Sequence, residues 1–176
     1  MTTAPAKLRW ALALFLVWVV VSGFMLFHTG GRHFGVFAES DNWTPVSLDA
    51  VSYGLSQKTG FQLIHVFEDG CACNSRAEKH IHKLASEAGL HVQEQRFVAP
   101  EQIAADGLQL PATPAVLIFK AGKMIYAGPY ASDVSCSVDN SLVLPILKQQ
   151  VILPGLWLNG ESNACRCATN WRDIEV

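Results

Sequence analysis

Hydrophobic residues are concentrated near the start of the chain. Residues 10–27, WALALFLVWVVVSGFMLF, include no charged side chain. As a helix that rises about 1.5 Å per residue, such a run nearly matches the hydrocarbon core of a bilayer. No polar stripe interrupts it, which argues against a helix that is half exposed on a soluble core. We therefore predict one transmembrane helix over residues 10–28, preceded by a short segment, residues 1–9.

The charges beside this run predict its orientation. Lys7 and Arg9 precede it together with the terminal amine, whereas Arg32 follows it. Because positive residues favour the cytoplasmic side, we expect a single-pass protein of the inner (cytoplasmic) membrane. Residues 1–9 would then be cytoplasmic and the C-terminal domain periplasmic.

A cleaved signal peptide is the alternative interpretation, with Thr29-Gly30-Gly31 as the cleavage site. The apolar run is longer than the usual 7–15 residues of a signal peptide, and no Ala-x-Ala follows it. An uncleaved anchor is therefore favoured. Both interpretations export the domain.

The pattern after the anchor predicts an α/β domain over residues 46–155, joined to the anchor by a linker over residues 29–45. Short apolar runs bounded by Gly, Asp or Pro predict strands, and apolar residues at helical spacing predict helices. The predicted helices cover residues 48–58, 74–87, 100–105 and 140–150. Ser47 caps the first of these helices and Gly60 ends it, and Pro145 lies in or near the first turn of the last. The predicted strands cover residues 61–67 and 91–98, followed by a hairpin of strands over 115–119 and 123–127. This order predicts a parallel unit with an antiparallel edge.

Composition narrows the classes of function. Hydrophobic residues form 50% of the chain and charged residues 16%, below the roughly 25% charged residues of soluble proteins, so part of the chain is expected in lipid. A net charge of -2 gives no broad basic surface, and we expect no nucleic-acid partner. The chain has no Gly-rich phosphate loop, no hydrolase nucleophile elbow and no acidic metal cluster, so we expect no cofactor.

The cysteines are the main candidates for chemistry. Cys71 and Cys73 follow the predicted strand over 61–67 and precede the predicted helix over 74–87. A helix N-terminus favours thiolate, so we expect Cys71 to attack and Cys73 to resolve the mixed disulfide. A bond between these two cysteines would close a very small ring, which stabilises little and exchanges readily.

A second Cys-x-Cys element, Cys165 and Cys167, lies in a predicted C-terminal tail, residues 156–176. Three roles are open for it. The tail pair could relay electrons to Cys71 and Cys73, or it could form a structural disulfide, within itself or to Cys136. The four thiolates of both elements could also bind Zn or Cu(I).

Two segments resemble the thioredoxin-fold superfamily. FQLIHVFEDGCACNSRAEKHIHKLASEAG is similar to its strand, active-site turn and helix, and LPATPAVLIFKAGKMIYAG to its later proline and hairpin. More narrowly, the chain resembles membrane-anchored, functionally uncharacterised thioredoxin-like proteins of bacteria. The resemblance covers residues 48–150 and implies a three-layer sandwich with a mixed central sheet. It also implies that Pro114 is a cis proline and that Thr113 and Pro114 bind the substrate.

The chain departs from that family at two places. The usual Trp-Cys-x-x-Cys is replaced by Gly70-Cys71-Ala72-Cys73, and His65 stands where a buried acid is common. His65 is a candidate for proton handling, although a hydrogen-bonded core histidine is the commoner outcome. His28 and His33 flank the linker, and we do not expect them to bind metal.

These observations predict a membrane-anchored thiol–disulfide oxidoreductase or disulfide carrier. Its partners would be thiol-bearing exported proteins or a redox partner protein. The alternatives are a thiolate site for Zn or Cu and a redox-inert interaction domain with a thioredoxin fold.

Overall fold

The structure is a computed structural model that describes residues 6–31, 33–38, 43, 46, 48–55, 60–90 and 94–169. It divides into two units, residues 1–32 and residues 33–176. The first unit is helix α1, Ala6–Gly31. Its part Lys7–Phe27 is long and apolar enough to cross a membrane, and none of it is buried in protein. The predicted apolar helix is therefore present.

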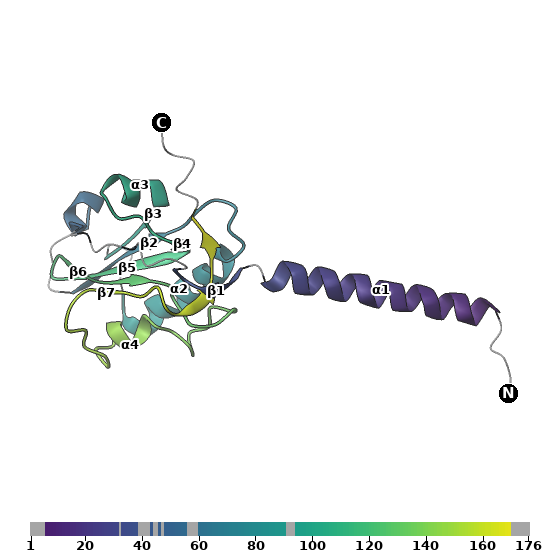
Figure 1. Cartoon of the computed structure of the whole chain (residues 1–176). Helices are drawn as coiled ribbons and strands as arrows, with labels where there is room; N and C mark the ends of the chain where they lie inside the picture. The colour runs from purple at the N-terminus through teal and green to yellow at the C-terminus, as the bar shows by residue number, and fades with distance from the viewer. Residues whose placement is uncertain are drawn as a thin grey trace. The chain divides into compact units, whose positions relative to one another are not determined.

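The second unit is built on a five-stranded mixed sheet with the order β3-β2-β5-β6-β7 (Figure 1). Its strands are β2 (Phe61–Val66), β3 (Gln95–Val98), β5 (Ala115–Lys120), β6 (Lys123–Gly128) and β7 (Trp157–Leu158). Strand β2 pairs in parallel with β3 and antiparallel with β5. The predicted strand at 61–67 and the predicted hairpin are confirmed, and so is the mixed sheet.

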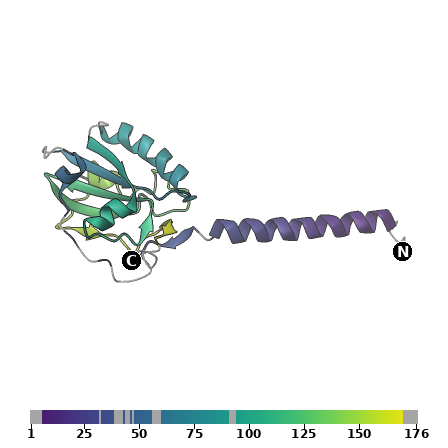
Figure 2. The ribbon, with the colours of Figure 1, turned by 90° about the horizontal axis from the view of Figure 1, so that it is seen from above.

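Helices cover both faces of this sheet. Helices α2 (Asn74–Ala88) and α4 (Leu144–Leu147) lie on one face, and α3 (Pro100–Ala105) and the 3-10 helix η1 (Ala50–Tyr53) lie on the other (Figure 1). Figure 2 shows α2 beside the same sheet from above. Because side chains alternate along a strand, β5 contributes to two cores: Val116 and Ile118 face one, and Leu117 and Phe119 face the other. The predictions of α2 and α3 are confirmed.

The predicted linker and tail both contribute strands to the second unit. Strand β1 (Phe34–Val36), in the predicted linker, pairs with β8 (Asn163–Cys165). Strand β9 (Cys167–Ala168) pairs with β4 (Ala112–Thr113), and β7 joins the central sheet. The predicted limits at residues 45 and 155 therefore cut through the unit. Strands of two or three residues carry no local pattern, because their partners lie far away in the sequence.

Two predicted helices are shorter in the structure. In place of a helix over 48–58 there is η1, where the Asp49 side chain accepts a hydrogen bond from Val51 N at 3.0 Å and Gly54, at φ 71, ends the turn. Ser47 and residues 56–59 lie outside the described residues. The helix predicted over 140–150 is the single turn α4, with Pro145 near its start. The strand predicted over 91–98 is described from Gln95, since residues 91–93 are outside the described part.

Candidate functional site

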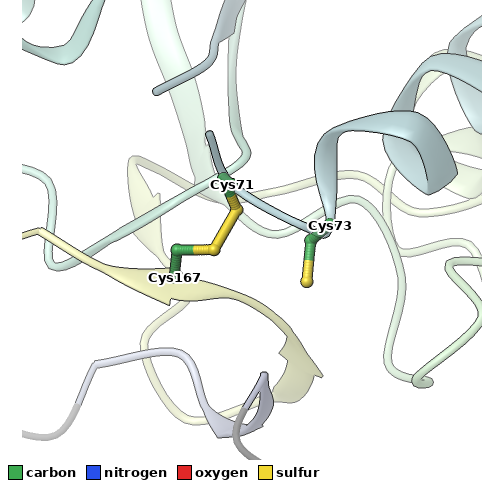
Figure 3. Close-up of side chains that lie close together, drawn as sticks. All are labelled: Cys71, Cys73 and Cys167. Carbon is green, nitrogen blue, oxygen red and sulfur yellow. A yellow bond between two sulfur atoms is a disulfide. The ribbon is translucent and has the colours of Figure 1, made fainter. Parts of the chain in front are cut away.

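Two disulfides join the Cys-x-Cys elements to each other. Cys71 is bonded to Cys167 and Cys73 to Cys165, over sequence separations of 96 and 92 residues. Figure 3 shows the first bond, with Cys73 beside it at the start of α2. Bonds within each pair, or from the tail to Cys136, are not formed, and Cys136 is free and buried. The physical reason is that the two Cys-x-Cys elements lie antiparallel to each other, so Cys71 faces Cys167 and Cys73 faces Cys165.

The turn between β2 and α2 places the first element. Gly70, at φ 78, adopts the left-handed conformation that glycine tolerates, and Cys73 is the residue that caps α2. Asn74 secures the turn twice: its N–H donates to Cys71 O at 3.1 Å and its side-chain amide donates to Glu68 O at 2.8 Å. The helix N-terminus therefore adjoins Cys73 more closely than Cys71.

Strands β8 and β9 place the second element. Cys165 ends β8, opposite Phe34 of β1, and Cys167 begins β9, opposite Thr113 of β4. Between them, the N–H of Arg166 donates to His33 O at 2.7 Å. Three segments far apart in the sequence therefore meet at the disulfides.

The two disulfides differ in exposure. Cys73 and Cys165 are buried, with 1% and 5% of their surface exposed. Cys71 and Cys167 are half-buried. The Sγ atoms of Cys71, Cys73 and Cys167 all lie within 4.8 Å of one another. The site thus has an accessible disulfide in contact with a sequestered one.

Basic side chains adjoin the two C-terminal sulfurs. Arg76 Nη1 lies 3.0 Å from Cys165 Sγ and also donates to Val134 O at 2.9 Å. His33 Nδ1 lies 3.7 Å from Cys167 Sγ. The sequence pattern places His33 beside the linker and contains no reason to expect it near Cys167, whereas Arg76 follows Cys73 by one helical turn and could have been noticed from that spacing.

The structure also brings Thr113 and Pro114 to the cysteines. The peptide bond between them is cis, as the resemblance implied. Thr113 O lies 3.7 Å from Cys71 Sγ. The buried Thr113 hydroxyl donates to Glu68 Oε2 at 3.1 Å, so the loop before β5 is tied to the turn that holds Cys71.

His65 lies in the core. Its Nδ1 is 2.8 Å from the Tyr130 hydroxyl, and its Nε2 is 3.0 Å from Gln95 Oε1. Burial lowers the pKa of His65 to about 4, against the opposing effect of the Gln95 hydrogen bond. This is the environment of a hydrogen-bonded core histidine, which the sequence favoured over proton handling.

Comparison with known protein families gives a match over most of the chain. A family model described as a domain of unknown function, DUF6436, matches residues 41–169. This range includes both Cys-x-Cys elements. No curated protein matches the chain.

Proposed function

The chain belongs to the DUF6436 family, and we propose that it is a membrane-anchored thiol–disulfide oxidoreductase or disulfide carrier for exported proteins. The observation that carries the proposal is the accessible Cys71–Cys167 disulfide packed against the buried Cys73–Cys165 disulfide. We take the second unit to be thioredoxin-like. Its mixed sheet between helical layers and its cysteine turn before α2 support this assignment.

The difference in exposure suggests that the two disulfides have different roles. Thiol–disulfide exchange requires a thiolate to reach a sulfur atom, and accessible disulfides are the exchangeable ones. Cys71 and Cys167 are half-buried, whereas Cys73 is 1% exposed. The first disulfide would therefore exchange, while the second keeps the C-terminal segment attached to α2. Accessibility selects Cys71 for the reaction although the helix end lies nearer to Cys73.

The proposed reaction balances without a cofactor. One thiolate of a partner attacks the Cys71–Cys167 bond, forms a mixed disulfide and releases a thiolate. The second thiol of the partner then attacks the mixed disulfide through its own thiolate. The partner dithiol loses two electrons and becomes a disulfide, while Cys71 and Cys167 gain two electrons and two protons and become thiols. The reverse sequence reduces a partner disulfide.

Two features support a location on the outer face of the inner membrane. Disulfides persist in oxidising compartments such as the periplasm, and both elements are disulfide-bonded in the structure. Lys7 and Arg9 before the apolar helix favour a cytoplasmic N-terminus. The proposal thus places the second unit in the periplasm.

The test measures oxidation of a dithiol peptide by the full chain in detergent. We expect the wild-type chain to oxidise one equivalent of peptide and Cys71→Ser to oxidise none, because this change removes the accessible disulfide. Cys136→Ala is the matched control, since Cys136 is outside both disulfides. It should keep the wild-type rate. Oxidation of the peptide by Cys71→Ser at the wild-type rate would contradict the proposal.

A thiolate metal site is the second candidate. Zn²⁺ binds sulfur ligands at about 2.3 Å, so three Sγ atoms within 4.8 Å of one another are close enough to share one ion, provided that the bonded sulfurs of Cys71 and Cys167 first separate. Both disulfides would have to be reduced first. Near-stoichiometric zinc or copper after anaerobic purification, lost in Cys71→Ser, would favour this function over exchange. A redox-inert interaction domain would instead show disulfides that resist mild reductant.

A further inference from the structure

We propose that the C-terminal segment, residues 166–169, occupies the place where a partner polypeptide binds. A cysteine-containing extended segment of the partner would replace β9 beside β4 and attack Cys71, and Cys167 would leave. This inference rests on the proposed function and adds to it how the partner is recognised and which sulfur is attacked.

Backbone pairing is the first observation behind this inference. Strand β9 lies antiparallel to β4, with Cys167 opposite Thr113 and Ala168 opposite Ala112. Just beyond β9, Thr169 N donates to Pro111 O at 3.2 Å, and the Thr169 hydroxyl donates to Leu110 O. In the described part of the chain, β4 pairs with β9 alone. If β9 moved away, the backbone N–H and C=O groups of β4 that now pair with it would become available to another strand.

The open edge would lie directly beside the reactive sulfur. Thr113 O is 3.7 Å from Cys71 Sγ, and the segment that is now joined to Cys71 by a disulfide pairs with Thr113. Addition of a strand to an exposed edge binds a peptide through its main chain, with little demand on its sequence. A carrier that serves varied exported proteins needs this kind of recognition.

The charges around the sulfurs indicate the direction of attack. Arg76 adjoins Cys165, and His33 Nδ1, in its N–H form, can donate to Cys167. The neighbour of Cys71 is instead a carbonyl oxygen, Thr113 O, which opposes negative charge. A sulfur that is stabilised as thiolate leaves faster. Cys167 is therefore the better leaving group and Cys71 the atom attacked.

In this step the partner thiolate forms a bond to Cys71 Sγ and the Cys71–Cys167 bond breaks. The electron pair of the broken bond moves to Cys167, which remains a thiolate beside His33 Nδ1 or takes a proton from water. The Cys73–Cys165 bond stays intact, so only the end of the tail from Arg166 onward has to move aside.

The test uses the full oxidised chain in detergent and a labelled heptapeptide. The peptide copies residues 163–169 with Cys165→Ser, and so keeps one thiol. After acid quenching and alkylation, peptide mapping should place the adduct on Cys71 and the alkyl group on Cys167. A matched peptide N-methylated at the residue equivalent to Thr169 lacks one backbone donor and should react about fivefold more slowly.

A pair of variants tests the same inference from the protein side. Thr169→Val keeps the side-chain shape but loses the hydroxyl donor to Leu110 O, so β9 should leave more readily and capture the peptide about threefold faster. Ser86→Ala removes a comparable hydroxyl-to-backbone hydrogen bond, to Lys83 O on α2, and should leave the rate unchanged.

The outcomes separate this inference from the proposed function. An adduct on Cys167 with Cys71 alkylated, equal rates for the two peptides, or no faster capture by Thr169→Val overturns the inference and leaves exchange chemistry standing. If neither peptide nor glutathione opens the disulfides, both proposals fail.

Discussion

The reactivity of each cysteine follows from the surroundings of its sulfur atom. Cys71 and Cys167 are half-buried at the surface of the second unit. Cys136 is the opposite case: burial first, and the charge of Asp133 second, raise the pKa of its thiol to about 12. Because the thiolate is the reacting form, Cys136 should be inert in the folded protein.

Alkylation tests this difference. At pH 8 a thiol with that pKa is ionised in about one molecule in ten thousand, so iodoacetamide should leave Cys136 unmodified in the native chain and modify it in urea. Mass spectrometry of the Cys136 peptide measures the modified fraction, and Cys136→Ala gives the background. Complete native labelling within minutes would contradict the prediction.

Buried His65 should make stability depend on pH. Its pKa is about 4 in the folded chain and about 6.5 when unfolded, so the unfolded state binds more protons between these values. The free energy of unfolding is therefore highest above pH 6.5 and falls as the pH drops toward 4, by about 1.4 kcal/mol per unit at most from this residue.

Urea unfolding at pH 7, 6 and 5 measures the slope. We expect His65→Gln, which keeps a hydrogen-bonding side chain, to flatten it. A smaller slope should remain because burial also lowers the pKa of His80. Identical slopes in the variant and the wild-type chain would show that His65 is not the titrating group.

At the level of elements, the two disulfides close almost the same loop. They join the turn before α2 to β8 and β9 over 96 and 92 residues. In the chain-entropy model, one such bond contributes about 4 to 5 kcal/mol, whereas the second closes only the small ring between the two bonds and adds about 2. Either bond alone thus retains most of the stabilisation, so the proposed exchange of the other would cost the fold little.

Cysteine variants in pairs should therefore be non-additive. Cys73→Ala with Cys165→Ala, or Cys71→Ala with Cys167→Ala, should lower the free energy of unfolding by about 2 kcal/mol, and all four changes by about three times as much. Urea unfolding of the full chain in detergent measures each loss. If the losses in the two double variants summed to the loss in the fourfold variant, the explanation that both disulfides close almost the same loop would be refuted.

At the scale of the whole molecule, α1 carries the membrane prediction. Its part Lys7–Phe27 is long and apolar enough to cross a membrane, and its apolar side chains are exposed. We expect Val17→Arg combined with Val20→Arg to release the chain from membranes, because each charge at the centre of a membrane helix costs about 2.5 to 3.5 kcal/mol.

Carbonate washing of membranes followed by detection of the chain in each fraction tests this. Val51→Arg is the control, since Val51 is exposed on the second unit and the change should leave the chain membrane-bound. Release of the control as well would mean general misfolding. The intact mass of the membrane-bound chain distinguishes an uncleaved anchor from a removed signal peptide.

The sequence by itself determined the elements whose signal is local. The buried strand β2, the amphipathic helix α2 and the β5–β6 hairpin each bury apolar residues at a spacing set by their own geometry. The position of Cys71 and Cys73 between β2 and α2 followed from the same pattern. The apolar helix α1 needed only composition and length.

Only the tertiary structure decided how the cysteines pair and which of them are accessible. Even with Cys136 set aside, the other four cysteines allow three connectivities, and the sequence cannot rank them. The choice is made by β8 and β9, which bring Cys165 and Cys167 against α2 through pairing with β1 and β4. Such short strands are specified by partners many residues away rather than by a local period. His33 and Arg76 reach the sulfurs for the same reason, through contacts that exist only once the chain has folded.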